Sequence, residues 1–131
     1  MSEIKIGASF EKEIMVTKEL LAVNVGSGDV SVFATPMMIC LMEEVSAKCL
    51  LSLLDEGMTS VGTSITSTHL AATPEGMKVK AIATITAVDG RKVSFDIKAY
   101  DEDGLIGEGT HERFIVFRDK FNEKANAKLS K

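Results

Sequence analysis

Hydrophobic residues dominate the segment 33–55, which is the longest stretch of helical character before the C-terminal tail. Thr35 is placed to cap the helix N-terminus, and Pro36 suits the first helical position because its missing amide hydrogen would be unpaired there. Gly57 is expected to end the helix. Since a helix that is apolar nearly all round has to be covered, the pattern predicts a central helix packed against other elements.

The acidic residues of this helix do not share one side. At about 100° per residue, Glu44 and Lys48 fall on one stripe, the predicted solvent face, with an i,i+4 spacing that favours an ion pair. Glu43 points roughly 135° away from that stripe, among apolar residues. Three interpretations stay open: its carboxylate is satisfied by an amide or an arginine, the helix is rotated further than this placement assumes, or burial tunes the carboxylate as a nucleophile or general base.

Alternating apolar and polar residues after the helix predict four strands, because side chains of a strand point to opposite faces in turn. The predicted strands are 59–73, 77–88, 92–100 and 105–117. Asp89-Gly90 is a strong hairpin signal. Before the helix, branched residues predict a strand within 13–25, followed by a loop at 26–29. An apolar helix with an antiparallel meander predicts an α+β fold in which the sheet wraps around the helix.

Such a sheet leaves an outer face and two edges uncovered. Pairing two sheets edge to edge would remove one exposed edge from each chain, so we expect a homodimer. The tail 118–131 is polar and compatible with a helix, which predicts a solvated end. Residues 1–12 carry mixed charge and little periodicity, with Phe10 as their one anchor.

Composition narrows the class of protein. The 131 residues, 45% of them hydrophobic, suit one domain spanning 1–131. A formal charge of -4 argues against nucleic-acid binding, which needs a basic surface. We find no secretion signal and no apolar run long enough for a membrane span, and therefore expect a soluble cytoplasmic protein. Cys40 and Cys49 should lie about 13 Å apart along the helix, out of disulfide reach, as reduced core residues.

Few residues outside Glu43 carry potential chemistry. His69, within a strand of small residues, is equally well explained as a hydrogen-bonded core imidazole or a catalytic one. Thr35 is first a cap, but its hydroxyl could hold a substrate near the positive end of the helix. His111 and Arg113 share one face of the last strand, where a cross-strand ion pair is the default and contact with an anionic substrate is the alternative.

Three groups of residues resemble the hot-dog-fold thioesterases related to fluoroacetyl-CoA thioesterase. They are Phe33-Ala-Thr35 with Leu41-Met-Glu43, then Gly62-Thr63 with Thr68-His69 and 71–74, and finally Gly107-x-Gly-Thr-His-Glu-Arg113. The groups occur in the family's order with near-colinear spacing, and the similarity extends over most of the chain.

The resemblance implies a hot-dog fold, with a five- or six-stranded antiparallel sheet around one long helix, and a dimer with active sites near the subunit interface. It also implies hydrolysis of an acyl-CoA thioester, in which coenzyme A is part of the substrate and neither a cofactor nor a metal is needed. By position, the family's catalytic residues fall on Thr35, Glu43 and His69. Gly62 matches a glycine near the thioester carbonyl, and Arg113 matches an arginine of the last block, so both are expected to contact substrate or oxyanion.

The mechanism expected from this match has Glu43 attack the thioester carbonyl or activate a water, while His69 transfers protons and Thr35 positions the reactants. One region departs from the family. Its fluoroacetyl-specific member carries phenylalanines shortly before the helix as a lid, whereas 24–30 has no aromatic residue here. The sequence therefore leaves the acyl group open.

Two other functions have to be distinguished from hydrolysis. One is a hot-dog hydratase or dehydratase acting on enoyl-CoA, and the other is a non-catalytic module that binds acyl-CoA or another small ligand. Release of free thiol from a saturated acyl-CoA separates hydrolysis from both.

Overall fold

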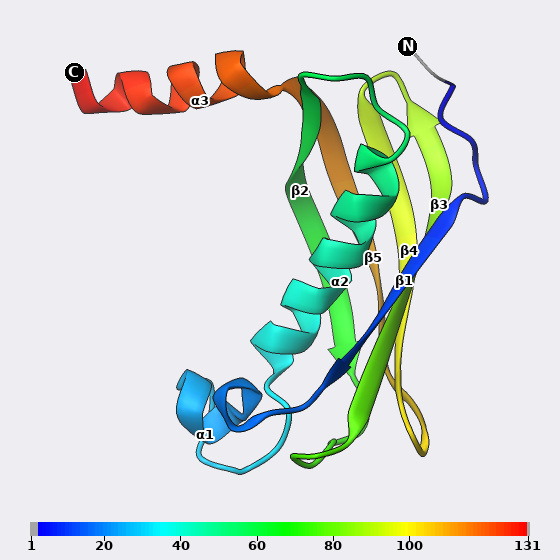
Figure 1. Cartoon of the computed structure of the whole chain (residues 1–131), viewed down its shortest axis with the longest axis vertical. Coiled ribbons are helices and arrows are strands. Elements are labelled where there is room, and N and C mark those ends of the chain that lie inside the picture. Colours follow the sequence, from blue (N-terminus) through cyan, green and yellow to red (C-terminus); the bar gives the residue numbers. More distant parts are fainter. Residues whose placement is uncertain (1–2, 131) are drawn as a thin grey trace.

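The computed structural model describes residues 3–130 as one curved antiparallel sheet around a long helix (Figure 1). Among these residues, no helix has the length and apolar character needed to cross a membrane. The elements in chain order are β1 (Ser9–Met15), η1 (Lys18–Leu20), α1 (Ala22–Val25), α2 (Thr35–Leu51), β2 (Met58–His69), β3 (Lys78–Asp89), β4 (Lys92–Asp101), β5 (Gly104–Phe117), α3 (Arg118–Asn126) and η2 (Ala127–Ser130).

The sheet has the strand order β1-β3-β4-β5-β2, with every neighbouring pair antiparallel. β1 and β2 are therefore its two edges. The four strands predicted after the helix all form, within a few residues of the expected boundaries. The α+β architecture expected from the pattern is confirmed.

Alternate residues of β3 and β4 face the helix and form the centre of the core. These inward-facing residues are essentially inaccessible to solvent: Val79, Ala81, Ala83, Ile85, Val93, Phe95, Ile97 and Ala99. From α2, Met38, Met42 and Val45 are equally buried in the same cluster. Small alanines in the sheet leave room for the long methionine side chains, so the helix lies close to the strands.

The strand predicted within 13–25 is wrong in position. β1 covers Ser9–Met15 and pairs with β3 from Ser9–Thr84 to Met15–Lys78, after which the chain turns into the short helices η1 and α1. β1 is an edge strand whose residues are exposed or half-buried, so it has no apolar face for periodicity to reveal. Leu21, which forms an isolated β-bridge with Phe33, and Ala22, the first residue of α1, are both buried, which explains the apolar composition that suggested a strand.

The helix boundaries also differ from expectation. Thr35 is the first residue of α2, Ala34 occupies the capping position, and no side chain caps the amides there. The helix ends at Leu51, well before Gly57, and the Ser52 hydroxyl donates a hydrogen bond to the Cys49 carbonyl. Thus the Thr35 hydroxyl is free for another partner.

The polar stripe of α2 is confirmed. The Glu44 carboxylate accepts hydrogen bonds from Lys48, at 2.8 Å, and from Lys12 of β1, at 2.6 Å. These bonds lower the pKa of Glu44. Cys49 is buried as expected, but Cys40 is exposed rather than part of the core, and neither forms a disulfide.

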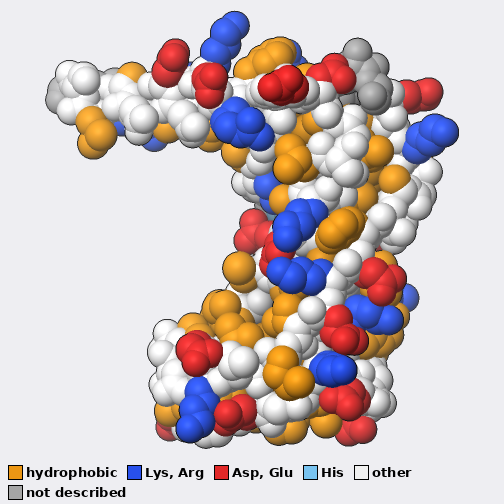
Figure 2. All heavy atoms as spheres, in the orientation of Figure 1, with side chains coloured by type: hydrophobic (Ala, Val, Ile, Leu, Met, Phe, Trp, Pro, Cys, Tyr) orange, Lys and Arg blue, Asp and Glu red, His pale blue; other side chains and the backbone are white. Residues whose placement is uncertain are grey.

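The C-terminal helix α3 extends away from the sheet, as Figures 1 and 2 show. All of its residues are exposed, as the polar composition predicted. It follows β5 without a loop, because Phe117 ends the strand and Arg118 begins the helix.

Candidate active site

The first turn of α2 and the last residue of β2 meet at a hydrogen-bonded pair. Thr35 Oγ1 lies 2.7 Å from His69 Nδ1. The other ring nitrogen, His69 Nε2, is buried and has no hydrogen-bond partner among the described residues. The Thr35 hydroxyl therefore fixes the imidazole, and Nε2 keeps an unused hydrogen-bonding position.

The surroundings of His69 favour its neutral form. Burial lowers the pKa of His69 below its ordinary value of 6.5, because a charged ring would lose hydration. The Phe33 ring meets the imidazole edge to face, with centroids 6.5 Å apart. At neutral pH the ring is therefore uncharged and able to accept a proton.

A cavity of about 400 Å³ opens beside this pair. Thr35, Pro36 and His69 form one wall, and the rest comes from α1, from the loop before α2 and from the residues after β2. These other lining residues are Ala22, Ser27, Gly28, Val30, Val32, Phe33, Leu70, Ala71 and Ala72. None of the lining side chains is formally charged at neutral pH, since the His69 ring is neutral.

Glu43 lies two turns further along α2, on a partly open face. Its side chain is 46% exposed, so the expected position on a buried face is wrong. The nearest cation is Arg113 of β5, whose Nη1 is 4.0 Å from Glu43 Oε2. The carboxylate is thus accessible to a reactant and lies beside a buried positive charge.

A network of hydrogen bonds fixes that guanidinium. Arg113 is only 7% exposed, and it donates from Nε to Ser60 Oγ and from Nη2 to the Ser60 carbonyl. His111 Nδ1 lies 2.8 Å from the Ser64 carbonyl, which can only accept, so Nδ1 carries the hydrogen. His111 Nε2 is then the acceptor for Arg113 Nη1, at 3.1 Å. Burial lowers the pKa of His111, which agrees with this neutral tautomer.

Gly62 permits the close approach of this network to β2. A Cβ atom at position 62 would lie 3.0 Å from Glu43 Oε2, 3.1 Å from His111 Cε1 and 3.4 Å from Arg113 Nη1. The pairing between β2 and β5 is also irregular between Gly62 and Ser64. A side chain at this position would crowd the Glu43 carboxylate.

The five residues singled out in the sequence therefore form two groups within the chain. Thr35 meets His69, whereas Glu43 meets Gly62 and Arg113. Along α2, Thr35 and Glu43 are eight residues and about 12 Å apart. Along β2, Gly62 and His69 are seven residues and roughly 23 Å apart. Sequence reasoning missed Ser60 and the hydrogen-bonding role of His111, although alternation had placed His111 and Arg113 on one face.

The chain is similar in sequence to enzymes of known activity. The model of the family described as fluoroacetyl-CoA-specific thioesterase matches residues 16–119. The fluoroacetyl-CoA thioesterase of Streptantibioticus cattleyicolor is 42% identical over 97 residues, covering 74% of this chain and 70% of that protein. The chain belongs to this family. Membership confirms the expected resemblance and the expected class of enzyme, a thioester hydrolase.

Solved structures of relatives agree with the family assignment. A threonine-to-serine variant of a fluoroacetyl-CoA thioesterase, in complex with acetyl-CoA, matches with a TM-score of 0.90 and 33% identity, covering 95% of this chain and 98% of that one. A Thermus thermophilus protein described as a thioesterase superfamily member matches with a TM-score of 0.90 and 32% identity, covering 99% of this chain and 96% of that one. The expected hot-dog fold is confirmed for this family member.

Proposed function

We propose that the protein hydrolyses an acyl-CoA thioester to a free acid and coenzyme A. The observation that carries the proposal is the Thr35–His69 hydrogen bond in the wall of an uncharged cavity. A hydroxyl and a neutral imidazole at an apolar pocket suit a reaction on a neutral thioester carbonyl. The related enzymes described above support the same reaction, since one is a fluoroacetyl-CoA thioesterase and another binds acetyl-CoA.

In the proposed mechanism, Glu43 attacks the thioester carbonyl or deprotonates a water that does so. The carbon–sulfur bond then breaks and the thiolate leaves. If Glu43 attacks, neutral His69 takes a proton from the water that hydrolyses the resulting acyl–Glu43 anhydride and passes it to the thiolate. If Glu43 deprotonates water instead, the proton it takes reaches the thiolate through His69. Thr35 holds the imidazole and contacts the substrate beside the positive end of α2. Amides near Gly62 or at the helix start would stabilise the oxyanion. Water is the one other reactant, so the proposal includes neither a cofactor nor a metal.

Arg113 takes a different role in this proposal from direct contact with substrate. Three of its nitrogens already donate to Ser60 and His111, and its side chain is almost completely buried. We propose that Arg113 positions Glu43 electrostatically and that Gly62 keeps the approach to the carboxylate open. His111 in turn orients the guanidinium through the tautomer set by Ser64.

We also propose that two chains form a homodimer through the edge strand β2. Antiparallel pairing of two β2 strands about a twofold axis near Ile65 would bring the Gly62 end of one strand beside the His69 end of its partner. This arrangement supports a site that combines Glu43 of one chain with Thr35 and His69 of the other. The setting we propose is the cytoplasm, where both free cysteines stay reduced.

Complementation between two inactive variants tests the shared site. If the site is shared, a heterodimer of Glu43→Gln and His69→Ala chains contains one intact site and one site with both changes. Mixing equal amounts after reversible unfolding should therefore restore about a quarter of wild-type activity. Light scattering should give twice the chain mass. A monomer, or a mixture that stays inactive although heterodimers form, would contradict the shared site.

Thiol release from a panel of saturated acyl-CoA thioesters tests the hydrolysis itself. We expect stoichiometric free thiol and free acid, followed with a thiol reagent and by mass spectrometry. Hydration of an enoyl-CoA without thiol release would favour a hydratase instead. Saturable binding of acyl-CoA with no turnover across the panel would favour a non-catalytic binding module.

A further inference from the structure

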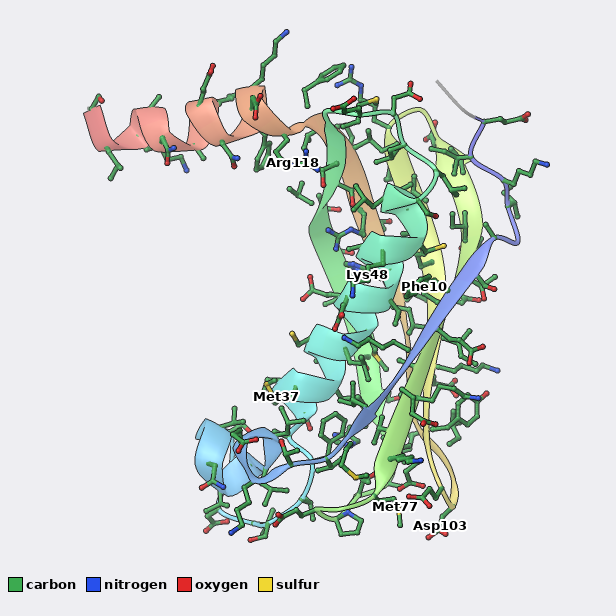
Figure 3. The ribbon with its side chains drawn as sticks, viewed as in Figure 1. Phe10, Met37, Lys48, Met77, Asp103 and Arg118 are labelled. Carbon is green, nitrogen blue, oxygen red and sulfur yellow. The ribbon has the colours of Figure 1, made fainter. Side chains whose placement is uncertain are left out.

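The cavity beside Thr35 and His69 has walls that specify what can occupy it. Figure 1 shows α1 and the loop that follows it beside the start of α2, and these segments supply most of the lining. In Figure 3, Met37 marks the first turn of α2 at this end of the molecule. The polar groups, Thr35 and His69, are on one wall, where a thioester carbonyl would be placed.

The remaining walls are apolar apart from Ser27, and none of the lining side chains is an aspartate, glutamate, lysine or arginine. Phosphates, or a carboxylate on the acyl group, would lose hydration there without gaining a charged partner. The occupant of the cavity is therefore an uncharged, apolar part of the substrate. In an acyl-CoA that part is the hydrocarbon of the acyl group.

Two large apolar side chains in the lining are unusually open to solvent. Val30 is 56% exposed and Leu70 is 57% exposed. They come from two separate segments, the loop before α2 and the residue after β2. An acyl chain between them would cover both, and the burial of apolar surface on both partners would favour binding.

The volume shows that the cavity has room for more than the smallest acyl groups. A methylene group takes up about the volume of a water molecule, roughly 30 Å³. A cavity of about 400 Å³ is much larger than an acetyl group needs. On the basis of the proposed hydrolysis, we infer that the enzyme acts on apolar, uncharged acyl groups of about four carbons or more in preference to acetyl groups.

Gly28 is a lining position at which a side chain can be introduced. Its backbone is not in the left-handed region, and an added Cβ would meet only Ala22 Cβ, at an ordinary 3.6 Å. A side chain at position 28 can therefore be accommodated without backbone strain, next to Ala22, which also lines the cavity. A leucine there would occupy space that the acyl chain uses.

The test compares acetyl-, butanoyl-, hexanoyl- and octanoyl-CoA in the wild type and in Gly28→Leu. In the wild type, kcat/KM should rise about threefold per added methylene until the cavity is full. In Gly28→Leu, kcat/KM for hexanoyl-CoA should fall about 10- to 50-fold, while the value for acetyl-CoA changes by less than about threefold. Val23→Leu is the matched control, because Val23 is exposed on α1 and outside the lining.

Binding of non-hydrolysable thioethers separates this inference from the proposed hydrolysis. S-hexyl-CoA should bind the wild type at least tenfold more tightly than S-ethyl-CoA in calorimetry, and Gly28→Leu should remove most of that difference. Selective binding without thiol release would overturn the proposed hydrolysis but support the cavity's preference. Equal binding of both thioethers, or acetyl-CoA as the best substrate, would overturn the inference about acyl length.

Discussion

Replacing Glu43 by glutamine is expected to lower kcat by about 10²- to 10⁴-fold, because the amide can neither attack a thioester nor deprotonate water. Glutamine has nearly the same size, and the side chain at position 43 is half exposed, so the free energy of unfolding should change little. Steady-state thiol release gives the rate, and thermal unfolding checks the fold.

Glu44→Gln is the matched control for this change. Glu44 is the next residue of the same helix, and its carboxylate is bonded to Lys12 and Lys48 on the solvent face. Its loss should leave kcat within about twofold, since exposed ion pairs contribute little. A Glu43→Gln enzyme with near-normal turnover would remove this residue from the mechanism.

Rapid quenching of the wild type during turnover distinguishes the two roles of Glu43. If its carboxylate attacks the carbonyl, peptide mass spectrometry should find a transient acyl adduct on Glu43. If it activates water instead, no adduct should accumulate even where product release is slow. Arg113→Lys would weaken the positioning of Glu43 in either mechanism, because lysine cannot reproduce the forked hydrogen bonds to Ser60.

Replacing His69 by alanine is expected to lower kcat/KM by about 10²- to 10⁴-fold, the usual contribution of a positioned acid–base group. Thr35→Val removes the hydroxyl that holds the ring and should cost about 10- to 100-fold. Thr35→Ser keeps a hydroxyl and should retain most of the activity. Equal losses in the valine and serine variants would contradict a role for the hydroxyl.

The pH dependence gives a second measurement on His69. Because burial lowers its pKa below 6.5, the neutral ring persists at neutral pH and becomes protonated only at lower pH. If the neutral form is active, kcat/KM should be level near pH 7 and fall as the pH drops through that lowered pKa. An activity that rises on acidification would show that the imidazolium is the active form.

Much of the fold was accessible from local patterns. Alternation located the four strands after the helix, because one face of each packs on α2 or its neighbours and a period of two is visible in the sequence. It failed for β1, whose sequence SFEKEIM does not alternate apolar and polar residues. The apolar content of 13–25 was a correct sign of burial, but Leu21 is buried at an isolated bridge to Phe33 and Ala22 at the start of α1, and neither lies within a strand.

The candidate residues were also found from the sequence, through the resemblance of their motifs to a family. The sequence did not show which of these residues lie next to each other, because that depends on contacts between distant positions. Thr35 and His69 are 34 positions apart, and only the meeting of α2 with the end of β2 joins them. Helical spacing placed Glu43 on an apolar face, whereas the curved sheet leaves that part of the helix half uncovered.

The sequence by itself determined the family, the wrapped-helix architecture and the identity of the residues with potential chemistry, since these depend on periodicity and motif order. The tertiary structure decided which of them touch. It placed Arg113 behind Glu43 as a buried cation, paired Thr35 with His69 instead of the helix amides, and opened an uncharged cavity beside that pair. Such relations come from the packing of separate elements, and no local pattern of residues contains them.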